Sequence, residues 1–108
     1  MRILFDQGVP RGLAWTLREY EVTEARKFGW EKISNGELLK LAEGAGFDLM
    51  VTTDKNLRYQ QNLSSRRIAL VVLGQSPWRL VRRHLDVILE TVNASSPGSF
   101  AEVAIPFE

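Results

Sequence analysis

Apolar runs alternate along the chain with segments of helical spacing, and the runs predict the strands of a sheet. Three of them, Arg2–Asp6, Phe47–Thr53 and Ile68–Leu73, consist mainly of apolar residues. Such runs are typical of parallel strands that are buried on both faces. Tyr20–Ala25 and Phe100–Ile105 are two further predicted strands, and a proline directly after the second places it at an edge of the sheet.

Helices are predicted between these strands, and most follow turn-forming residues. Gly8 and Pro10 precede the first helix. The second begins within Ser34–Glu37 and is closed by glycines that include Gly46. Its inward-facing stripe is predicted to comprise Leu38, Leu41, Ala42 and Ala45. A short helix is predicted over Asn56–Leu63.

The longest predicted helix begins at Ser76–Pro77, with the serine as N-cap and the proline just inside the helix. Its buried face is predicted to carry Val81, Leu85, Ile88 and Val92. The alternation of strands and helices predicts a mainly parallel five-stranded sheet with helices on both faces. The fold class is therefore α/β, a three-layer α/β/α sandwich, and residues 1–108 are expected to form a single domain.

Composition excludes several kinds of site. The chain has no cysteine, which rules out disulfides, zinc–thiolate centres and a cysteine nucleophile. It shows no secretory signal and no apolar run long enough to cross a bilayer. We therefore expect a cytoplasmic protein without a membrane partner.

Positive charge is concentrated in one segment, Lys55–Arg83, which contains no acidic residue. Its basic residues are Lys55, Arg58, Arg66, Arg67, Arg79, Arg82 and Arg83. The segment predicts either a surface that binds phosphate groups or a solvated face that meets water or an acidic partner. The pattern of charge favours neither interpretation.

Three acids are expected near one edge of the sheet. Asp6 and Asp54 follow predicted parallel strands, and Glu37 lies in the first turn of a helix that begins near the same edge. Carboxylates that converge need a cation, and hard oxygen ligands favour Mg²⁺ or Mn²⁺. A metal in this position can activate water and stabilise the charge that develops on a phosphodiester. The pattern predicts a metal-dependent nuclease in which these acids are catalytic and bind the metal.

Each acid also has a purely structural interpretation. Glu37 stands three residues after Ser34, which is the spacing of a capping box, and this role is as well supported as metal binding. Asp6 could cap the turn that follows it, and Asp54 could cap the helix at Asn56, although we favour the site for both. Further residues are predicted to orient the acids or contact the substrate: Gln7, Asn35, Thr53, Lys55, Asn56 and Arg58.

Four stretches of the sequence resemble the PIN-like domains of the DUF5615 family, compact relatives of the PIN-domain ribonucleases of bacterial toxin–antitoxin systems. The stretches lie within residues 1–73 and read RILFDQGVPRGL, NGELLKLA, FDLMVTTDKNLRYQQNL and RRIALVVL. The resemblance implies an acidic Mg²⁺ or Mn²⁺ site formed by Asp6, Glu37 and Asp54. It also implies an RNA substrate, a small cognate antitoxin protein as partner in a type II toxin–antitoxin pair, and a tendency to self-associate.

The chain departs from the family pattern at three polar positions. Family members commonly have an acid after the first aspartate, where this chain has Gln7, and many have acids where it has Asn35 and Asn56. The predicted site is therefore poorer in carboxylates than that of a full PIN nuclease. The amides motivate an alternative hypothesis, a catalytically weak or inactive PIN-like module that binds RNA or protein. A phosphoacceptor receiver domain is a third hypothesis, disfavoured by Gln7 and by the absence of lysine from the last strand.

Overall fold

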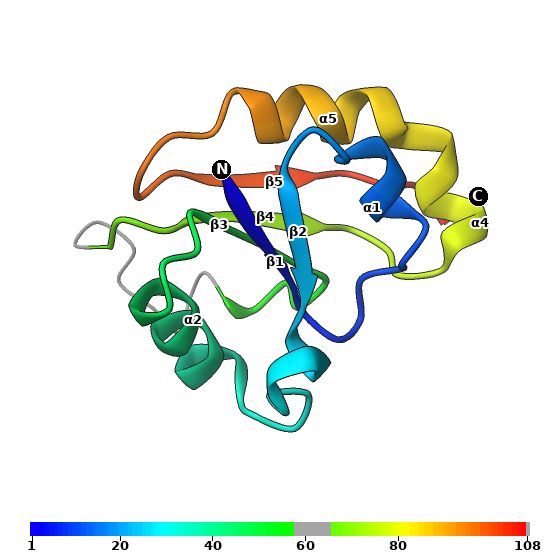
Figure 1. The fold of residues 1–108 in the computed structure, drawn as a ribbon. Helices are drawn as coiled ribbons and strands as arrows, with labels where there is room; N and C mark the ends of the chain where they lie inside the picture. The colour runs from blue at the N-terminus through cyan, green and yellow to red at the C-terminus, as the bar shows by residue number, and fades with distance from the viewer. Residues whose placement is uncertain (58–65, 108) are drawn as a thin grey trace.

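A computed structural model describes residues 1–57 and 66–107, and it contains a five-stranded sheet in which every strand pair is parallel. The strands lie in the order β2-β1-β3-β4-β5 (Figure 1). Their bounds are Arg2–Phe5 for β1, Glu21–Glu24 for β2, Leu49–Thr52 for β3, Ala69–Leu73 for β4 and Phe100–Val103 for β5. The five predicted strands and the predicted edge position of the last are confirmed.

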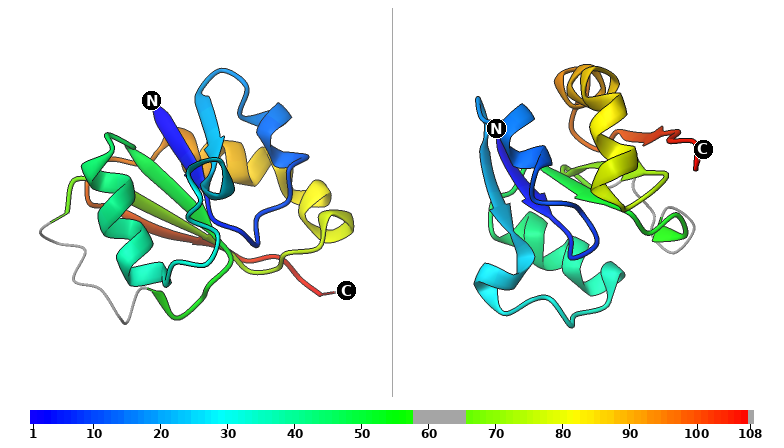
Figure 2. Two further views of the ribbon diagram at one scale, coloured as in Figure 1. Left: turned by 60° about the horizontal axis from the view of Figure 1, so that its bottom comes forward. Right: turned by 90° about the vertical axis from the view of Figure 1, so that its right-hand side faces the viewer.

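Helices cover both faces of the sheet, which confirms the three-layer α/β sandwich. Helices α1 (Leu13–Thr16), α4 (Trp78–Val81) and α5 (Leu85–Asn93) lie on one side, and α2 (Asn35–Gly44) lies on the other (Figures 1 and 2). Two 3-10 helices complete the described elements, η1 at Ala25–Phe28 and η3 at Arg82–His84. None of the helices in the described ranges is long and apolar enough to span a membrane.

The sheet separates two apolar cores because side chains alternate along each strand. Ile3 and Phe5 of β1 join the core beneath α1, α4 and α5, whereas Leu4 between them joins the core beneath α2. β4 alternates in the same way and is buried along its whole length. Burial on both faces explains why these strands are almost entirely apolar in sequence.

The buried face of α2 differs from its predicted stripe. Leu38, Leu39 and Ala42 are buried, whereas Leu41 is only half-buried and Ala45 is exposed. The helix ends at Gly44, so Ala45 already belongs to the turn that leads into β3. The buried stripe is therefore rotated around the helix axis towards Leu39. Helical periodicity allows a stripe that includes Leu39 as readily as one that includes Leu41.

The predicted long helix after Ser76 is interrupted, and Ser76 is not its N-cap. Pro77 occupies that position with an extended ψ of 131°, and the chain then forms α4, η3 and α5 in succession. The Ser76 hydroxyl instead donates a 2.6 Å hydrogen bond to the carbonyl oxygen of Gly8. The predicted buried face is confirmed at Val81, Ile88 and Val92, whereas Leu85 is half-buried. The helix predicted over residues 56–63 falls mostly outside the described residues.

Glu43 fixes the start of β4 from the end of α2. Its Oε2 accepts hydrogen bonds from the backbone N–H groups of Arg67 at 2.6 Å and Ile68 at 3.2 Å. Its Oε1 accepts one from Nη1 of Arg66 at 3.1 Å. The backbone donor of Arg67, with further contributions from Ile68 and Arg66, lowers the pKa of the Glu43 carboxyl.

Substituting Glu43 by glutamine is expected to lower the free energy of unfolding by about 1–2 kcal/mol at pH 7. Because the folded pKa lies below the ordinary value, the carboxylate stabilises the fold above that ordinary value. This contribution is lost as the pH falls through the lowered pKa, so the wild type and Glu43→Gln should converge in acid. Urea denaturation at pH 7 and at successively lower pH measures the difference. Glu19→Gln, at an exposed acid, is the control, and equal stability of all three proteins at pH 7 would contradict the expectation.

Candidate functional site

The topological switch point of the sheet lies between β1 and β3. From β1 the chain crosses to β2 on one side, and from β3 it crosses to β4 on the other. Open α/β sheets bind ligands in the crevice outside the carboxyl ends of the strands at such a point. Asp6 follows β1, and Thr53 and Asp54 follow β3, so Asp6 and Asp54 both lie at the carboxyl ends of the strands at this point.

Thr52 connects the two aspartates through its hydroxyl. The register pairs Phe5 with Val51, which brings the next residues, Asp6 and Thr52, side by side. Thr52 is fully buried, and its Oγ1 donates a 2.7 Å hydrogen bond to Oδ2 of Asp6. The same oxygen accepts a 3.1 Å hydrogen bond from the backbone N–H of Asp54. The hydroxyl therefore fixes the Asp6 carboxylate and the backbone of Asp54 relative to one another.

The Asp6 carboxylate is held by a second donor and remains half-buried. Its Oδ1 accepts a 2.7 Å hydrogen bond from the backbone N–H of Gln7, whose side chain is exposed. The backbone N–H of Asp6 itself continues the ladder to β3 by donating to the carbonyl of Val51 at 2.9 Å. Asp6 is thus positioned by backbone and buried groups.

Gly8 lets the loops after β1 and β3 meet. A Cβ atom on Gly8 would lie 2.3 Å from Oγ1 of Thr53, far closer than real atoms approach. Thr53 is half-buried and occupies the space that a side chain at position 8 would need. The role of Thr53 in this structure is therefore to pack against the loop that carries Asp6.

Asp54 has the hydrogen bond of a capping residue. Its Oδ1 accepts a 2.9 Å hydrogen bond from the backbone N–H of Asn56. The chain then turns so that Leu57 becomes buried, while Lys55 and Asn56 stay exposed. This hydrogen bond is the one expected of a cap, whereas the helix predicted after Asn56 lies mostly outside the described residues.

Glu37 is exposed in the first turn of α2. The predicted capping box is wrong, because the side chain of Ser34 makes no capping hydrogen bond. Among residues 1–57 and 66–107, no group of three or more His, Cys, Asp or Glu side chains is arranged to hold a metal ion. The site made of all three acids stays a prediction. Asn35 begins α2, but its side chain lies outside what the structure describes, and so does all of Arg58.

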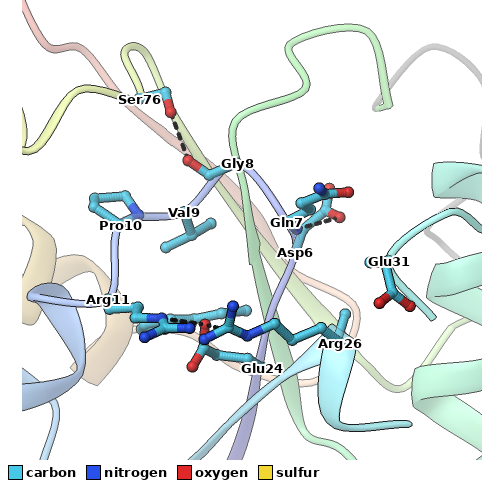
Figure 3. Close-up of a pocket in the computed structure, with 12 residues that line it drawn as sticks. Asp6, Gln7, Gly8, Val9, Pro10, Arg11, Glu24, Arg26, Glu31 and Ser76 are labelled. Carbon is cyan, nitrogen blue, oxygen red and sulfur yellow. Dashed lines mark hydrogen bonds and ion pairs between the residues drawn. The ribbon is translucent and has the colours of Figure 1, made fainter. Parts of the chain in front are cut away.

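A pocket of about 550 Å³ opens beside Asp6, between the loop after β1 and the end of β2 (Figure 3). Four charged residues outside the predicted site line it: Arg11, Glu24, Arg26 and Glu31. Glu24 is the last residue of the parallel strand β2. The expectation that ligands bind at the carboxyl ends of parallel strands could therefore have identified it. The remaining three lie in loops and in η1, and only the folded chain brings them together.

The described part of the basic segment, Lys55–Leu57 and residues 66–83, does not form one uninterrupted cationic surface. Arg66 pairs with Glu43, and both side chains are largely buried. Arg67 lies beside the amino ends of the strands, where it lines small pockets with Pro97 and Asp48. The described basic residues that are exposed near the carboxyl edge are therefore fewer than the sequence count suggests.

Comparisons with known proteins give no match: no family model, curated protein or solved structure is similar to this chain at a significant level.

Substituting Thr52 by valine tests the link between the aspartates. Valine keeps the shape and strand preference of threonine but removes the hydroxyl, so Asp6 loses a donor and the N–H of Asp54 loses its acceptor. We expect the free energy of unfolding to fall by about 1–3 kcal/mol, as measured by urea denaturation. The same change at Thr23, a half-buried threonine of β2, is the matched control. Equal effects of the two substitutions would show that the hydroxyl of Thr52 has no special role.

Proposed function

We propose that this protein is a metal-dependent endoribonuclease that hydrolyses phosphodiester bonds in RNA, with Asp6 and Asp54 as its central acids. The observation that carries the proposal is the junction of these residues through the buried hydroxyl of Thr52. A carboxylate needs this kind of support to act as a ligand, because fixed geometry distinguishes a site from a set of mobile surface acids. The location between β1 and β3 is where this sheet type binds ligands.

The available donors fit Mg²⁺ or Mn²⁺. Both ions prefer hard oxygen ligands, and Mg²⁺ is usually held by one or two carboxylates, with water and substrate phosphates completing its shell. Asp6 and Asp54 supply two such carboxylates, and exposed Glu37 is the proposed third acid. A bound divalent ion would lower the pKa of a water molecule and stabilise negative charge on the phosphate.

The protein's own groups would orient the acids and contact the substrate. The backbone N–H of Gln7 and the hydroxyl of Thr52 hold both oxygens of Asp6, while the N–H of Asn56 holds one oxygen of Asp54. Lys55 is exposed directly after Asp54 and carries a positive charge to the place where an RNA backbone would approach. Arg58, Asn35 and Asn56 are proposed as further substrate contacts.

The biological setting follows from the resemblance to PIN-like domains and belongs to the same proposal. In this proposed setting, the protein is the toxin of a type II toxin–antitoxin pair in the cytoplasm. It associates with a small antitoxin protein and can self-associate. The sheet and its two helical layers, described for residues 1–57 and 66–107, would serve as the scaffold of such a compact nuclease.

One observation favours a second function, RNA or protein binding without catalysis. The Asp54 carboxylate caps the turn at Asn56, so its presence has a structural cause that requires no metal. Gln7 and Asn56 would then present amide groups at the crevice in place of further acids. Isothermal titration calorimetry separates the functions, because the nuclease is expected to bind Mn²⁺ and the binding module is not.

RNA cleavage tests the proposal directly. We expect purified protein to cleave a mixed-sequence RNA in Mn²⁺ and to lose that activity when EDTA removes the metal, with recovery on adding excess Mn²⁺. Cleavage that persists unchanged in EDTA would contradict a metal-dependent mechanism. No cleavage in either condition, together with no Mn²⁺ binding, would favour the binding module.

A further inference from the structure

The pocket beside Asp6 contains two arginines that share one carboxylate. Nε of Arg11 lies 3.4 Å from Oε1 of Glu24, and Nε of Arg26 lies 3.6 Å from the same oxygen. Figure 3 shows the two side chains reaching Glu24 from opposite sides, one from the loop after β1 and the other from η1. The three groups therefore form one charged cluster with a formal charge of +1.

Stability alone is a weak reason for this cluster. The side chains of Arg11 and Arg26 are 64% and 50% exposed, and ion pairs as exposed as these contribute little to stability. A single arginine would also neutralise Glu24. The second one brings two cations close to each other and gives this cluster a net positive charge. Asp6 and Glu31 line the same pocket, so the positive charge is confined to the arginine side.

The geometry leaves the outer parts of both guanidinium groups able to bind an anion. Each arginine makes its closest approach to Glu24 through Nε, and each guanidinium has five N–H donors in a fixed fork. Arginine forks match the oxygens of a phosphate, often with two parallel hydrogen bonds. Glu24 would hold the two forks in place, so that less side-chain entropy is lost when a phosphate binds.

The rest of the pocket suits a nucleotide. Its volume of about 550 Å³ lies within the usual range of small-ligand sites. Val9 and Pro10 provide an apolar wall, Gln7 and Ser76 add polar side chains, and Glu31 adds an acid away from the two arginines. Asp6 lines the same pocket, so a nucleotide bound here would adjoin the proposed catalytic crevice.

We propose that Arg11 and Arg26, held by Glu24, bind a phosphate group of the RNA at a position next to the bond that is cleaved. The ligand is a phosphate attached to a ribonucleoside, either an internal phosphodiester or a terminal 5′-phosphate. This assignment rests on the proposed function, because it takes RNA as the ligand. Arg11 and Arg26 are substrate-positioning residues and take no part in the chemical step.

Binding measured without metal tests the assignment separately from cleavage. The probe is a short oligoribonucleotide with a 3′ fluorophore, prepared with either a 5′-phosphate or a 5′-hydroxyl, and fluorescence anisotropy is recorded in EDTA. We expect Arg11→Gln and Arg26→Gln each to weaken binding about tenfold, as the loss of charged hydrogen bonds at a partly exposed site implies. Arg18→Gln is the matched control and should bind like the wild type. It removes the same charge from an exposed position just after α1.

The outcomes separate the possible ligands. Weaker binding of both probes would support an internal phosphodiester, and weaker binding of the 5′-phosphate probe alone would support a terminal phosphate. Affinities of Arg11→Gln and Arg26→Gln equal to that of Arg18→Gln, or no saturable binding by the wild type, would overturn the assignment. Circular dichroism melts check folding, and if one variant fails to fold, the other carries the test. A protein that binds through these arginines but cleaves no RNA in Mn²⁺ would contradict only the proposed function.

Discussion

Asp54→Asn is expected to lower Mn²⁺-dependent RNA cleavage by at least about a hundredfold and to leave the fold intact. Removing one of the proposed carboxylate ligands would weaken both the binding of the cation and the stabilisation of charge on the phosphate, effects worth several kcal/mol. Asparagine retains an oxygen that can accept the hydrogen bond from the N–H of Asn56, and it is among the preferred capping residues. The substitution therefore separates the ligand role of Asp54 from its capping role.

Initial cleavage rates at saturating Mn²⁺ and thermal melting together measure the two roles. Asp86→Asn is the matched control, since it makes the same chemical change at an exposed aspartate in the first turn of α5. An unchanged cleavage rate in Asp54→Asn would show that the nuclease mechanism is wrong. A large fall in melting temperature would instead show that the asparagine fails as a cap.

The central strands β1, β3 and β4 were predictable because burial on both faces of a parallel sheet leaves little room for polar residues. Ile3, Leu4 and Phe5 all had to be apolar, since successive side chains enter different cores. The interruption after Ser76 was not predictable from helical spacing. It depends on Pro77 and on a hydrogen bond from Ser76 to Gly8, a residue 68 positions earlier in the chain.

The candidate site was predictable in its location and less so in its chemistry. Because the carboxyl ends of parallel strands meet at one edge of a sheet, the strand ends alone predicted that Asp6 and Asp54 lie at the same edge. The link through Thr52 depends on the register between β1 and β3, which pairs Phe5 with Val51 and cannot be read from either strand alone. The cluster of Arg11, Glu24 and Arg26 needs three separate segments to meet, and local spacing contains no signal of that.

Asp6→Asn is expected to reduce cleavage as strongly as Asp54→Asn but, unlike it, to destabilise the protein by about 1 kcal/mol. The two oxygens of Asp6 accept hydrogen bonds from different donors, the N–H of Gln7 and the hydroxyl of Thr52. Asparagine offers one oxygen and one NH₂ group, so one of these donors loses its acceptor. Thr52 can turn its hydroxyl to accept from the NH₂ group, but the hydroxyl proton then lacks a partner within a fully buried residue. Urea denaturation at pH 7 measures this loss, and equal stability of the two variants would contradict the network.

The double variant Asp6→Asn/Asp54→Asn distinguishes one shared site from two separate ones. Groups that act as a unit have strongly non-additive effects on rate, because removing either one already disables the unit. If both carboxylates coordinate the same cation, the double variant should cleave RNA no more slowly than the slower single variant. Losses that multiply would show that Asp6 and Asp54 contribute independently, and the shared hydroxyl of Thr52 would then be a structural link between two sites that bind no common metal.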